Sequence, residues 1–126
     1  MSLTLYCLNG PNLNLLGQRE PHIYGTATLA DVEALCAETC AGLGASLVFR
    51  QTNREGELID WLQEARREAD AVVLNAAAYT HTSIDVAPAA SGAVAGFGPF
   101  GYRLALQAAA HLARERAGER RHRTDG

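Results

Sequence analysis

Three short stretches of this chain gather side chains that could bind an oxygen-rich acid and move a proton. They are residues 9–17, 51–55 and 75–83, and each follows an apolar run typical of a strand. Amides can stabilise a developing oxyanion or hold a water, and a histidine can bind a ligand or transfer a proton. The polar side chains concerned are Asn9, Asn12, Asn14, Asn53, Asn75, Tyr79, Thr80, His81, Thr82 and Ser83.

A fourth stretch, residues 17–25, is polar, bounded by glycines and expected to be a loop at the same place. It carries Arg19 and Tyr24. A free tyrosine titrates near about 10, and a guanidinium beside it favours the phenolate. Tyr24 is therefore a candidate base, and the whole set predicts proton abstraction next to a carbonyl of a small acid. We expect no metal, because no His, Cys, Asp or Glu cluster has ligand spacing.

Each of these residues also has a purely structural interpretation. An asparagine after a strand usually caps or turns the chain, and a single tyrosine or histidine often only packs. Convergence favours function, since Asn12, Tyr24, Asn75 and His81 belong to different loops expected at one sheet edge. The other histidines lack such neighbours and are interpreted as surface residues: His22, His111 and His122.

The elements that must position these residues follow from apolar patterning. Strands are predicted at 3–8, 46–50 and 71–74, with helices between them. Asn53 is expected to cap the second helix, whose apolar positions are Leu58, Ile59, Leu62 and Ala65. Strand, helix, strand, helix, strand predicts an α/β fold with a central parallel sheet.

The first helix has clear start and stop signals. Thr28 followed by Asp31 resembles a capping box. Gly42 and Gly44 are expected to end the helix.

The last third of the chain departs from this alternation. Residues 85–98 are rich in Ala, Gly and Pro, and only 92–95 could form a short strand. Pro99 suits the first turn of a last helix, predicted to end near Arg116. Residues 1–116 are thus expected to be one domain, and 117–126 a charged, frayed tail.

Composition excludes several classes of function. The 126 residues carry a net charge of −3, and every basic residue is arginine. Without lysine, no Schiff base can form on a lysine side chain and no Walker-type phosphate loop is possible. No apolar run is long enough to span a membrane, and a pI near 5.7 gives no basic surface for nucleic acid.

The cysteines and the first residues indicate the compartment. Cys7, Cys36 and Cys40 are interpreted as small core residues, because two of them lie four apart in a helical pattern that suits no disulfide. The first residues lack the basic segment of a signal peptide. We therefore expect a reducing, cytoplasmic setting.

Long segments of the chain resemble the type II 3-dehydroquinate dehydratases. The matching segments are 8–17 (LNGPNLNLLG), 19–21 (REP), 24–25 (YG), 53–61 (NREGELIDW), 75 (N), 79–83 (YTHTS) and 96–102 (GFGPFGY). The resemblance implies a flavodoxin-like, three-layer sandwich assembled as a homododecamer of trimers. It implies reversible anti-elimination of water from 3-dehydroquinate, through an enolate, to give 3-dehydroshikimate, without any cofactor. It implies neither a nucleic-acid nor a membrane partner.

The resemblance also assigns roles to individual residues. Tyr24 matches the base that removes the C2 proton, and Arg19 the arginine that lowers the pKa of that tyrosine. Asn12 matches the residue that holds a water against the enolate oxygen. Asn75 and His81 match substrate-binding positions. The absence of lysine agrees, because the unrelated type I enzyme needs a Schiff-base lysine.

One internal segment of the family pattern is missing after Ile84. Family members continue with a helix and a strand that brings a Glu-x-His-x-Ser-Asn segment to the site, whereas here Ile84 is followed by Asp85. The missing histidine is the general acid of the family, and a clamping arginine is missing with it. The chain is therefore expected to lack one helix–strand unit.

Two alternatives follow from this gap and from the fold. The chain could be a catalytically impaired relative that binds a cyclic hydroxy-acid or serves as an assembly module. A flavodoxin-like nucleotide binder is disfavoured, because the loop after the first strand lacks a hydroxyl-rich phosphate cradle.

Overall fold

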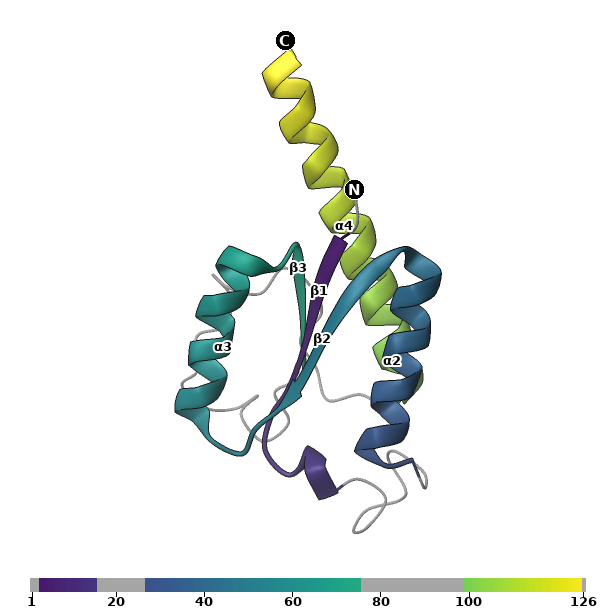
Figure 1. The fold of residues 1–126 in the computed structure, drawn as a ribbon, viewed down its shortest axis with the longest axis vertical. Coiled ribbons are helices and arrows are strands. Elements are labelled where there is room, and N and C mark those ends of the chain that lie inside the picture. The colour runs from purple at the N-terminus through teal and green to yellow at the C-terminus, as the bar shows by residue number, and fades with distance from the viewer. Residues whose placement is uncertain (1–2, 16–26, 76–98, 126) are drawn as a thin grey trace.

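The computed structural model describes residues 3–15, 27–75 and 99–125 (Figure 1). Within these ranges the side chains of residues 15, 99, 100 and 119–125 are not described. The elements are β1 (Leu3–Asn9), a short 3₁₀ helix η1 (Leu13–Leu15), α2 (Leu29–Leu43), β2 (Ala45–Gln51), α3 (Glu55–Glu68), β3 (Ala71–Asn75) and α4 (Pro99–Asp125).

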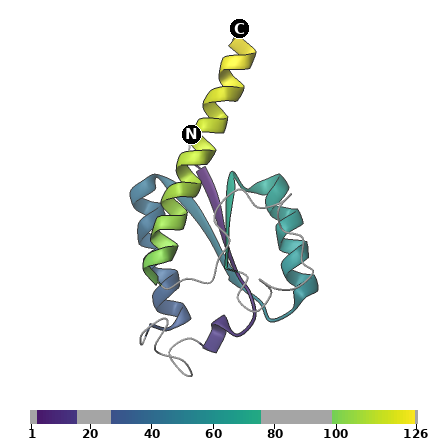
Figure 2. The same cartoon turned by 180° about the vertical axis from the view of Figure 1, so that it is seen from behind.

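The three described strands form one parallel sheet with the order β2-β1-β3. Helices α2 and α4 cover one face of the sheet and α3 covers the other (Figures 1 and 2). The predicted parallel α/β fold with three layers is confirmed. The order 2-1-3 is that in which a flavodoxin-like sheet begins. Residues 92–95, where a short strand is expected, lie outside the described residues. The junction after Ile84, where one helix–strand unit is expected to be missing, lies outside them as well.

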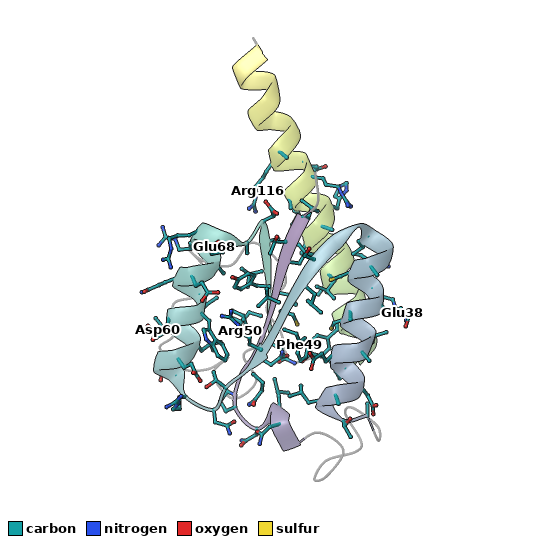
Figure 3. All side chains as sticks on the ribbon, in the orientation of Figure 1. Glu38, Phe49, Arg50, Asp60, Glu68 and Arg116 are labelled. Atoms are coloured by element: carbon teal, nitrogen blue, oxygen red, sulfur yellow. The ribbon has the colours of Figure 1, made fainter. Side chains whose placement is uncertain are left out.

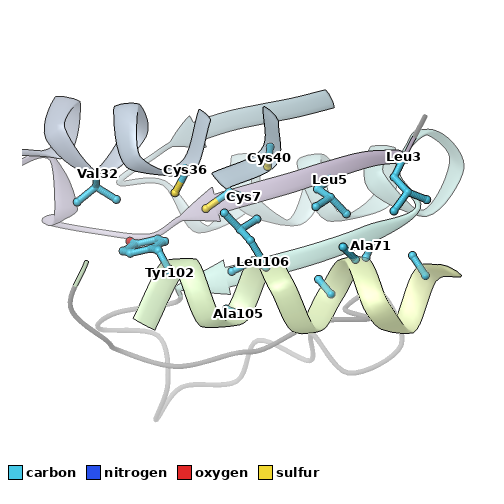
Figure 4. Packing of buried hydrophobic residues seen from close by; sticks show 14 of the residues in the cluster. Leu3, Leu5, Cys7, Val32, Cys36, Cys40, Ala71, Tyr102, Ala105 and Leu106 are labelled. Carbon is cyan, nitrogen blue, oxygen red and sulfur yellow. The ribbon is translucent and has the colours of Figure 1, made fainter. Parts of the chain in front are cut away.

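The larger core lies between the sheet and the helices α2 and α4 (Figure 4). Alternate residues of each strand face it, because side chains of a strand point to opposite faces in turn. From β1 these are Leu3, Leu5 and Cys7, and from β3 Ala71 and Val73. The inner face of α4 supplies small alanines and the larger Tyr102 and Leu106.

The three cysteines are buried and free, as predicted for core residues. Figure 4 shows the sulfur atoms of Cys7 and Cys36 turned toward each other between β1 and α2. A hydrogen bond with Cys36, followed by burial, raises the pKa of the Cys7 thiol well above its ordinary value. Burial raises the pKa of Cys40 to about 11. Both groups are therefore protonated thiols at neutral pH.

The smaller core lies between the sheet and α3. Tyr6 and Leu8 of β1 pack there against Leu58 and Leu62. The predicted buried face of α3 is confirmed except at Ile59, which is 37% exposed. Position 59 follows Leu58 directly, so it is turned by about 100° from the buried stripe of a helix with 3.6 residues per turn.

A cluster of charged and aromatic side chains around Arg50 lies at the edge of this second core. Arg50 points toward α3 while its neighbour Phe49 points toward α2 (Figure 3). The Arg50 guanidinium lies 5.5 Å from the ring centres of both Tyr6 and Trp61. It also pairs with Glu64 at 3.0 Å. This cluster stabilises the half-exposed strand β2 at the edge of the described sheet.

Helix α2 begins and ends where its local signals indicate. The Thr28 hydroxyl accepts from the Asp31 N–H at 3.1 Å, and the Asp31 carboxylate accepts from the Thr28 N–H at 2.9 Å, which confirms the capping box. Gly44 ends the helix with φ of 69°, a left-handed conformation that favours glycine. The prediction that Gly42 also ends the helix is wrong, since Gly42 lies within α2. A single glycine costs a helix only about 1 kcal/mol, which the buried face of α2 offsets.

Two predicted helix boundaries need correction. Asn53 does not cap α3; the helix has Arg54 at its N-cap, and Asn53 bonds elsewhere, as described below. Helix α4 begins at Pro99 as predicted, but it continues to Asp125 instead of ending near Arg116. The residues after Arg116 include Ala117, Glu119 and three arginines, which are good helix formers. Figures 1 and 2 show this extension leaving the sheet at the edge opposite to the strand ends that lead to η1.

Arg114 joins α4 to the end of α2. Its guanidinium donates to the main-chain carbonyl of Leu43, one of the last carbonyls of α2. None of the helices in the described ranges has the length and apolar character needed to cross a membrane.

Candidate active site at the carboxyl edge of the sheet

The three strands end side by side, at one level. Asn9 is the register partner of both Gln51 and Asn75, and these three residues are the last of their strands. The N–H of Gly10 donates to the Asn75 carbonyl and the N–H of Thr52 to the Asn9 carbonyl, each at 2.9 Å. Strands β2 and β3 flank β1 on opposite sides, and the connecting helices α2 and α3 lie on opposite faces of the sheet. In a flavodoxin-like sheet of this order, ligands bind beyond the carboxyl ends of β1 and β3.

A buried hydrogen-bond network joins the ends of β1 and β3 to helix α4. The Tyr102 hydroxyl donates to Oδ1 of Asn9 at 2.6 Å and accepts from Nδ2 of Asn75 at 2.9 Å. All three residues are fully buried. Both asparagines follow the alternation of the residues that face α2 and α4, so their side chains point to the face where Tyr102 lies.

A second network holds the loop after β1. The main-chain N–H of Asn12 donates to Oδ1 of Asn53 at 2.9 Å. Nε2 of Gln51 donates to the same oxygen at 3.1 Å and to the Gly10 carbonyl at 3.2 Å. Asn12 has φ of 67°, a left-handed conformation that asparagine tolerates better than most residues, and it is exposed. The loop thus presents the Asn12 carboxamide at the edge of the sheet.

The turn between β2 and α3 is held by a separate set of bonds. The Thr52 hydroxyl donates to Glu57 at 2.5 Å and accepts from the N–H of Arg54 at 3.0 Å. The Thr52 hydroxyl, followed by the Arg54 charge, lowers the pKa of the Glu57 carboxyl. Glu57 is therefore ionised at neutral pH. Its carboxylate is held by Thr52 and Arg54 and is not available as a general acid.

The structure brings two of the five predicted site residues to this edge. Asn12 and Asn75 lie at the ends of neighbouring strands, with Asn12 exposed and Asn75 buried. Tyr24, Arg19 and His81 lie outside the described residues, as do 79–83 as a whole. Among the histidines interpreted as surface residues, His111 is confirmed, since it is exposed on α4 and pairs with Glu115 at 3.0 Å. His22 and the side chain of His122 are not described.

Sequence reasoning missed the parts that hold these residues in place. The sequence assigns no role at the site to Tyr102, and it indicates Gln51 and Asn53 only as parts of the polar stretch 51–55, with Asn53 also expected to cap a helix. For Tyr102 a signal existed: an aromatic residue with a polar tip stands in the first turn of a helix whose buried positions are otherwise mostly alanine. A buried tyrosine hydroxyl needs a partner. In the ranges that the structure describes, no three potential metal ligands lie together.

The comparisons with known proteins agree on one family. The family described as "Dehydroquinase class II" matches residues 3–91. The 3-dehydroquinate dehydratase of Phenylobacterium zucineum is 47% identical over 145 residues, covering 90% of this chain and 100% of that protein. The 3-dehydroquinate dehydratase of Azorhizobium caulinodans is 63% identical over 92 residues, covering 73% of this chain and 62% of that protein.

Solved structures give the same result. The type II dehydroquinase of Propionibacterium acnes superimposes with a TM-score of 0.77 at 34% identity, covering 88% of this chain and 98% of that one. A 3-dehydroquinate dehydratase-like protein from Bifidobacterium longum gives a TM-score of 0.64 at 31% identity, covering 89% and 98%.

The lengths of these matches agree with an internal gap. The Phenylobacterium match takes in about 113 residues of this chain, which is 90% of 126, but extends over 145. About 32 positions of that relative therefore have no counterpart here, which agrees with the segment expected to be missing after Ile84. With a family match over residues 3–91 and a relative that is 47% identical along its whole length, this chain belongs to the class II dehydroquinase family.

Proposed function

We propose that this chain acts on 3-dehydroquinate as a hydro-lyase, removing water in an anti-elimination to give 3-dehydroshikimate, a step of the shikimate pathway. The family match over residues 3–91 carries this proposal. The strand ends support it, because they place amide side chains at the β1/β3 switch point, where a small oxygen-rich ligand would bind.

The proposed reaction begins with proton transfer from carbon. The phenolate of Tyr24 takes the proton from C2, and the electrons of the broken C–H bond move into the neighbouring carbonyl to form an enolate. Arg19 lowers the pKa of Tyr24, so that the phenolate is available at neutral pH. Asn12 holds a water whose hydrogen bond stabilises the enolate oxygen. Asn75 and His81 bind polar groups of the substrate.

The second half of the reaction expels the hydroxyl group at C1. The enolate electrons form the new C=C bond, the C–O bond breaks, and the departing oxygen takes a proton to leave as water. In the family a histidine supplies this proton, and the segment that carries it is missing here. Loss of a general acid costs about 100- to 10,000-fold in rate. We therefore expect the first half of the reaction to survive better than the second.

The direct test follows the absorbance of the conjugated product. Purified protein is mixed with 3-dehydroquinate, and the ultraviolet absorbance of 3-dehydroshikimate is recorded, first at catalytic and then at stoichiometric protein. Slow but protein-dependent product formation is the expected result. No product at stoichiometric protein would contradict dehydration by this chain.

A second candidate function is ligand binding without turnover, which the missing acid favours. Calorimetry with 3-dehydroquinate separates the two, since binding without product would indicate an impaired relative.

We further propose that the protein works in the cytoplasm and assembles as a homododecamer of trimers. Sedimentation velocity tests the assembly, and a monomeric protein at micromolar concentration would contradict it.

A further inference from the structure

The Asn9–Tyr102–Asn75 network has a fixed polarity that starts at a main-chain group. Nδ2 of Asn9 donates to the Arg50 carbonyl at 3.0 Å, and a carbonyl can only accept. The amide nitrogen of Asn9 must therefore face Arg50, which leaves its oxygen facing Tyr102. That oxygen takes the hydroxyl proton of Tyr102 at 2.6 Å.

The same reasoning continues to Asn75. Because the one proton of the Tyr102 hydroxyl is committed to Asn9, the hydroxyl can only accept from Asn75. The Asn75 carboxamide must then present its nitrogen to Tyr102, at 2.9 Å, and turn its oxygen away. The Tyr102 hydroxyl thus favours one orientation of the Asn75 amide, with the nitrogen toward Tyr102 and the oxygen on the other side.

We propose that Tyr102 is a positioning residue for substrate binding, which acts by fixing the orientation of the Asn75 carboxamide at the β1/β3 edge. This inference rests on the proposed function, in which Asn75 binds a cyclic hydroxy-acid. A carboxylate of such a ligand can only accept from the amide nitrogen, whereas a hydroxyl can also donate to the amide oxygen, so the orientation of the amide decides which of these groups it can bind. Because Tyr102 lies in the first turn of α4, the orientation of the Asn75 amide depends on the position of α4 against the sheet.

The test variant is Tyr102→Phe, which keeps the buried ring and deletes only the hydroxyl. Its matched control is Tyr6→Phe. The Tyr6 ring is also buried, at 4% exposure, and its hydroxyl also makes a 2.6 Å hydrogen bond, but to Glu64 on the α3 side of the sheet. Both variants lose one hydroxyl from a packed ring, and only Tyr102 contacts the asparagines at the strand ends.

Three measurements are made on both variants and on the unaltered protein: calorimetry, NMR, and steady-state kinetics that give KM and kcat from the absorbance of the product. Calorimetry gives the Kd for 3-dehydroquinate, and side-chain NH₂ signals of Asn75, assigned with Asn75→Asp, give the state of the amide by NMR without any ligand. We expect Tyr102→Phe to weaken binding about tenfold, the size of effect typical of losing a buried hydrogen bond. It should raise KM more than it lowers kcat, and speed hydrogen exchange of the Asn75 NH₂. Tyr6→Phe should leave all three unchanged.

The outcomes separate the two proposals. Unchanged Asn75 NH₂ signals in Tyr102→Phe, or a Kd equal to that of an unaltered protein that binds, would overturn the positioning role. An unaltered protein that does not bind 3-dehydroquinate would overturn the proposed function, and the NMR measurement would still decide the role of Tyr102. If Tyr6→Phe lost as much affinity as Tyr102→Phe, the loss would reflect general instability, and this would also overturn the positioning role of Tyr102.

Discussion

The main-chain N–H of Asn12 donates a 2.9 Å hydrogen bond to Oδ1 of Asn53, and this bond ties the loop after β1 to the turn after β2. Asn12 makes it with φ of 67°, in the left-handed region that most side chains avoid. The residue at position 12 must therefore meet two requirements. Its backbone must adopt this conformation, and in the proposed function its exposed carboxamide must hold a water.

Two substitutions separate these requirements. Asn12→Gly permits the conformation and should leave the free energy of unfolding within about 0.5 kcal/mol of the unaltered protein. Asn12→Ala should lower it by about 1 kcal/mol. Both remove the carboxamide, so both should reduce turnover of 3-dehydroquinate. Urea unfolding and the absorbance assay measure the two effects. Normal turnover in Asn12→Gly would exclude the side chain from the reaction, and equal stability of the two variants would contradict the conformational requirement.

The two glycines at the end of α2 predict opposite effects of alanine. Gly44 has φ of 69°, and among the described residues a Cβ there would meet only Arg114 Nη2 at 3.8 Å, an ordinary contact. Gly44→Ala should thus lower the free energy of unfolding by about 1 kcal/mol through backbone strain alone. Gly42 lies in the helix, and no atom of the described residues lies within 4 Å of a Cβ built there, so Gly42→Ala should raise stability by about 0.5–1 kcal/mol. Thermal unfolding of both variants checks this, and a change of the same sign in both would be inconsistent with the assigned helix end.

Glu64 is predicted to make folding depend on acid pH. The Tyr6 hydroxyl at 2.6 Å, followed by Arg50 at 3.0 Å, lowers the pKa of Glu64 below its usual 4.5. A carboxyl with a lowered pKa in the folded state contributes stability above its unfolded value, and this contribution is lost as the pH falls through the folded value. Glu64→Gln should therefore be less stable than the unaltered protein at pH 6, with a difference that shrinks below pH 4.5.

Urea unfolding at a series of pH values from 6 to 3 measures this difference. Glu33→Gln, which removes an exposed carboxylate of α2, controls for the simple loss of one charge. A stability gap between Glu64→Gln and the unaltered protein that stays constant over this range would show that the bonds of Glu64 contribute nothing that depends on its charge.

The elements of this fold could be predicted from sequence because their signals are local. The Thr28–Asp31 capping box and the buried run of β3 each lie within a few residues, and both appear in the structure. The errors have local causes as well. Gly42 looks like a helix end but is held inside α2 by its buried face, and the charged tail after Arg116 contains good helix formers that continue α4.

The site could be predicted only in outline. The rule that ligands bind beyond the carboxyl ends of parallel strands located Asn12 and Asn75 correctly at one edge. What holds them could not be found this way, because the decisive contacts join distant residues. Tyr102 and Asn9 are 93 positions apart, and Asn12 and Asn53 are 41 apart. No periodicity or motif within a single element reports on such pairs.

The missing general acid predicts that the two halves of the proposed reaction can be observed separately. In the proposed function, enolate formation uses Tyr24, Arg19 and Asn12, which this chain has, whereas loss of the hydroxyl uses the general acid of the missing segment. In D₂O, the Tyr24 phenol formed by proton abstraction exchanges with solvent and returns deuterium to C2. Proton NMR should therefore show loss of the signal of one of the two C2 protons of 3-dehydroquinate faster than growth of the 3-dehydroshikimate signals, by up to about 100- to 10,000-fold, as is typical of a lost acid. Tyr24→Phe should abolish both processes, and Tyr6→Phe should affect neither. Exchange that persists in Tyr24→Phe would remove this tyrosine from the role of base, and dehydration as fast as exchange would mean that another group of the chain supplies the proton.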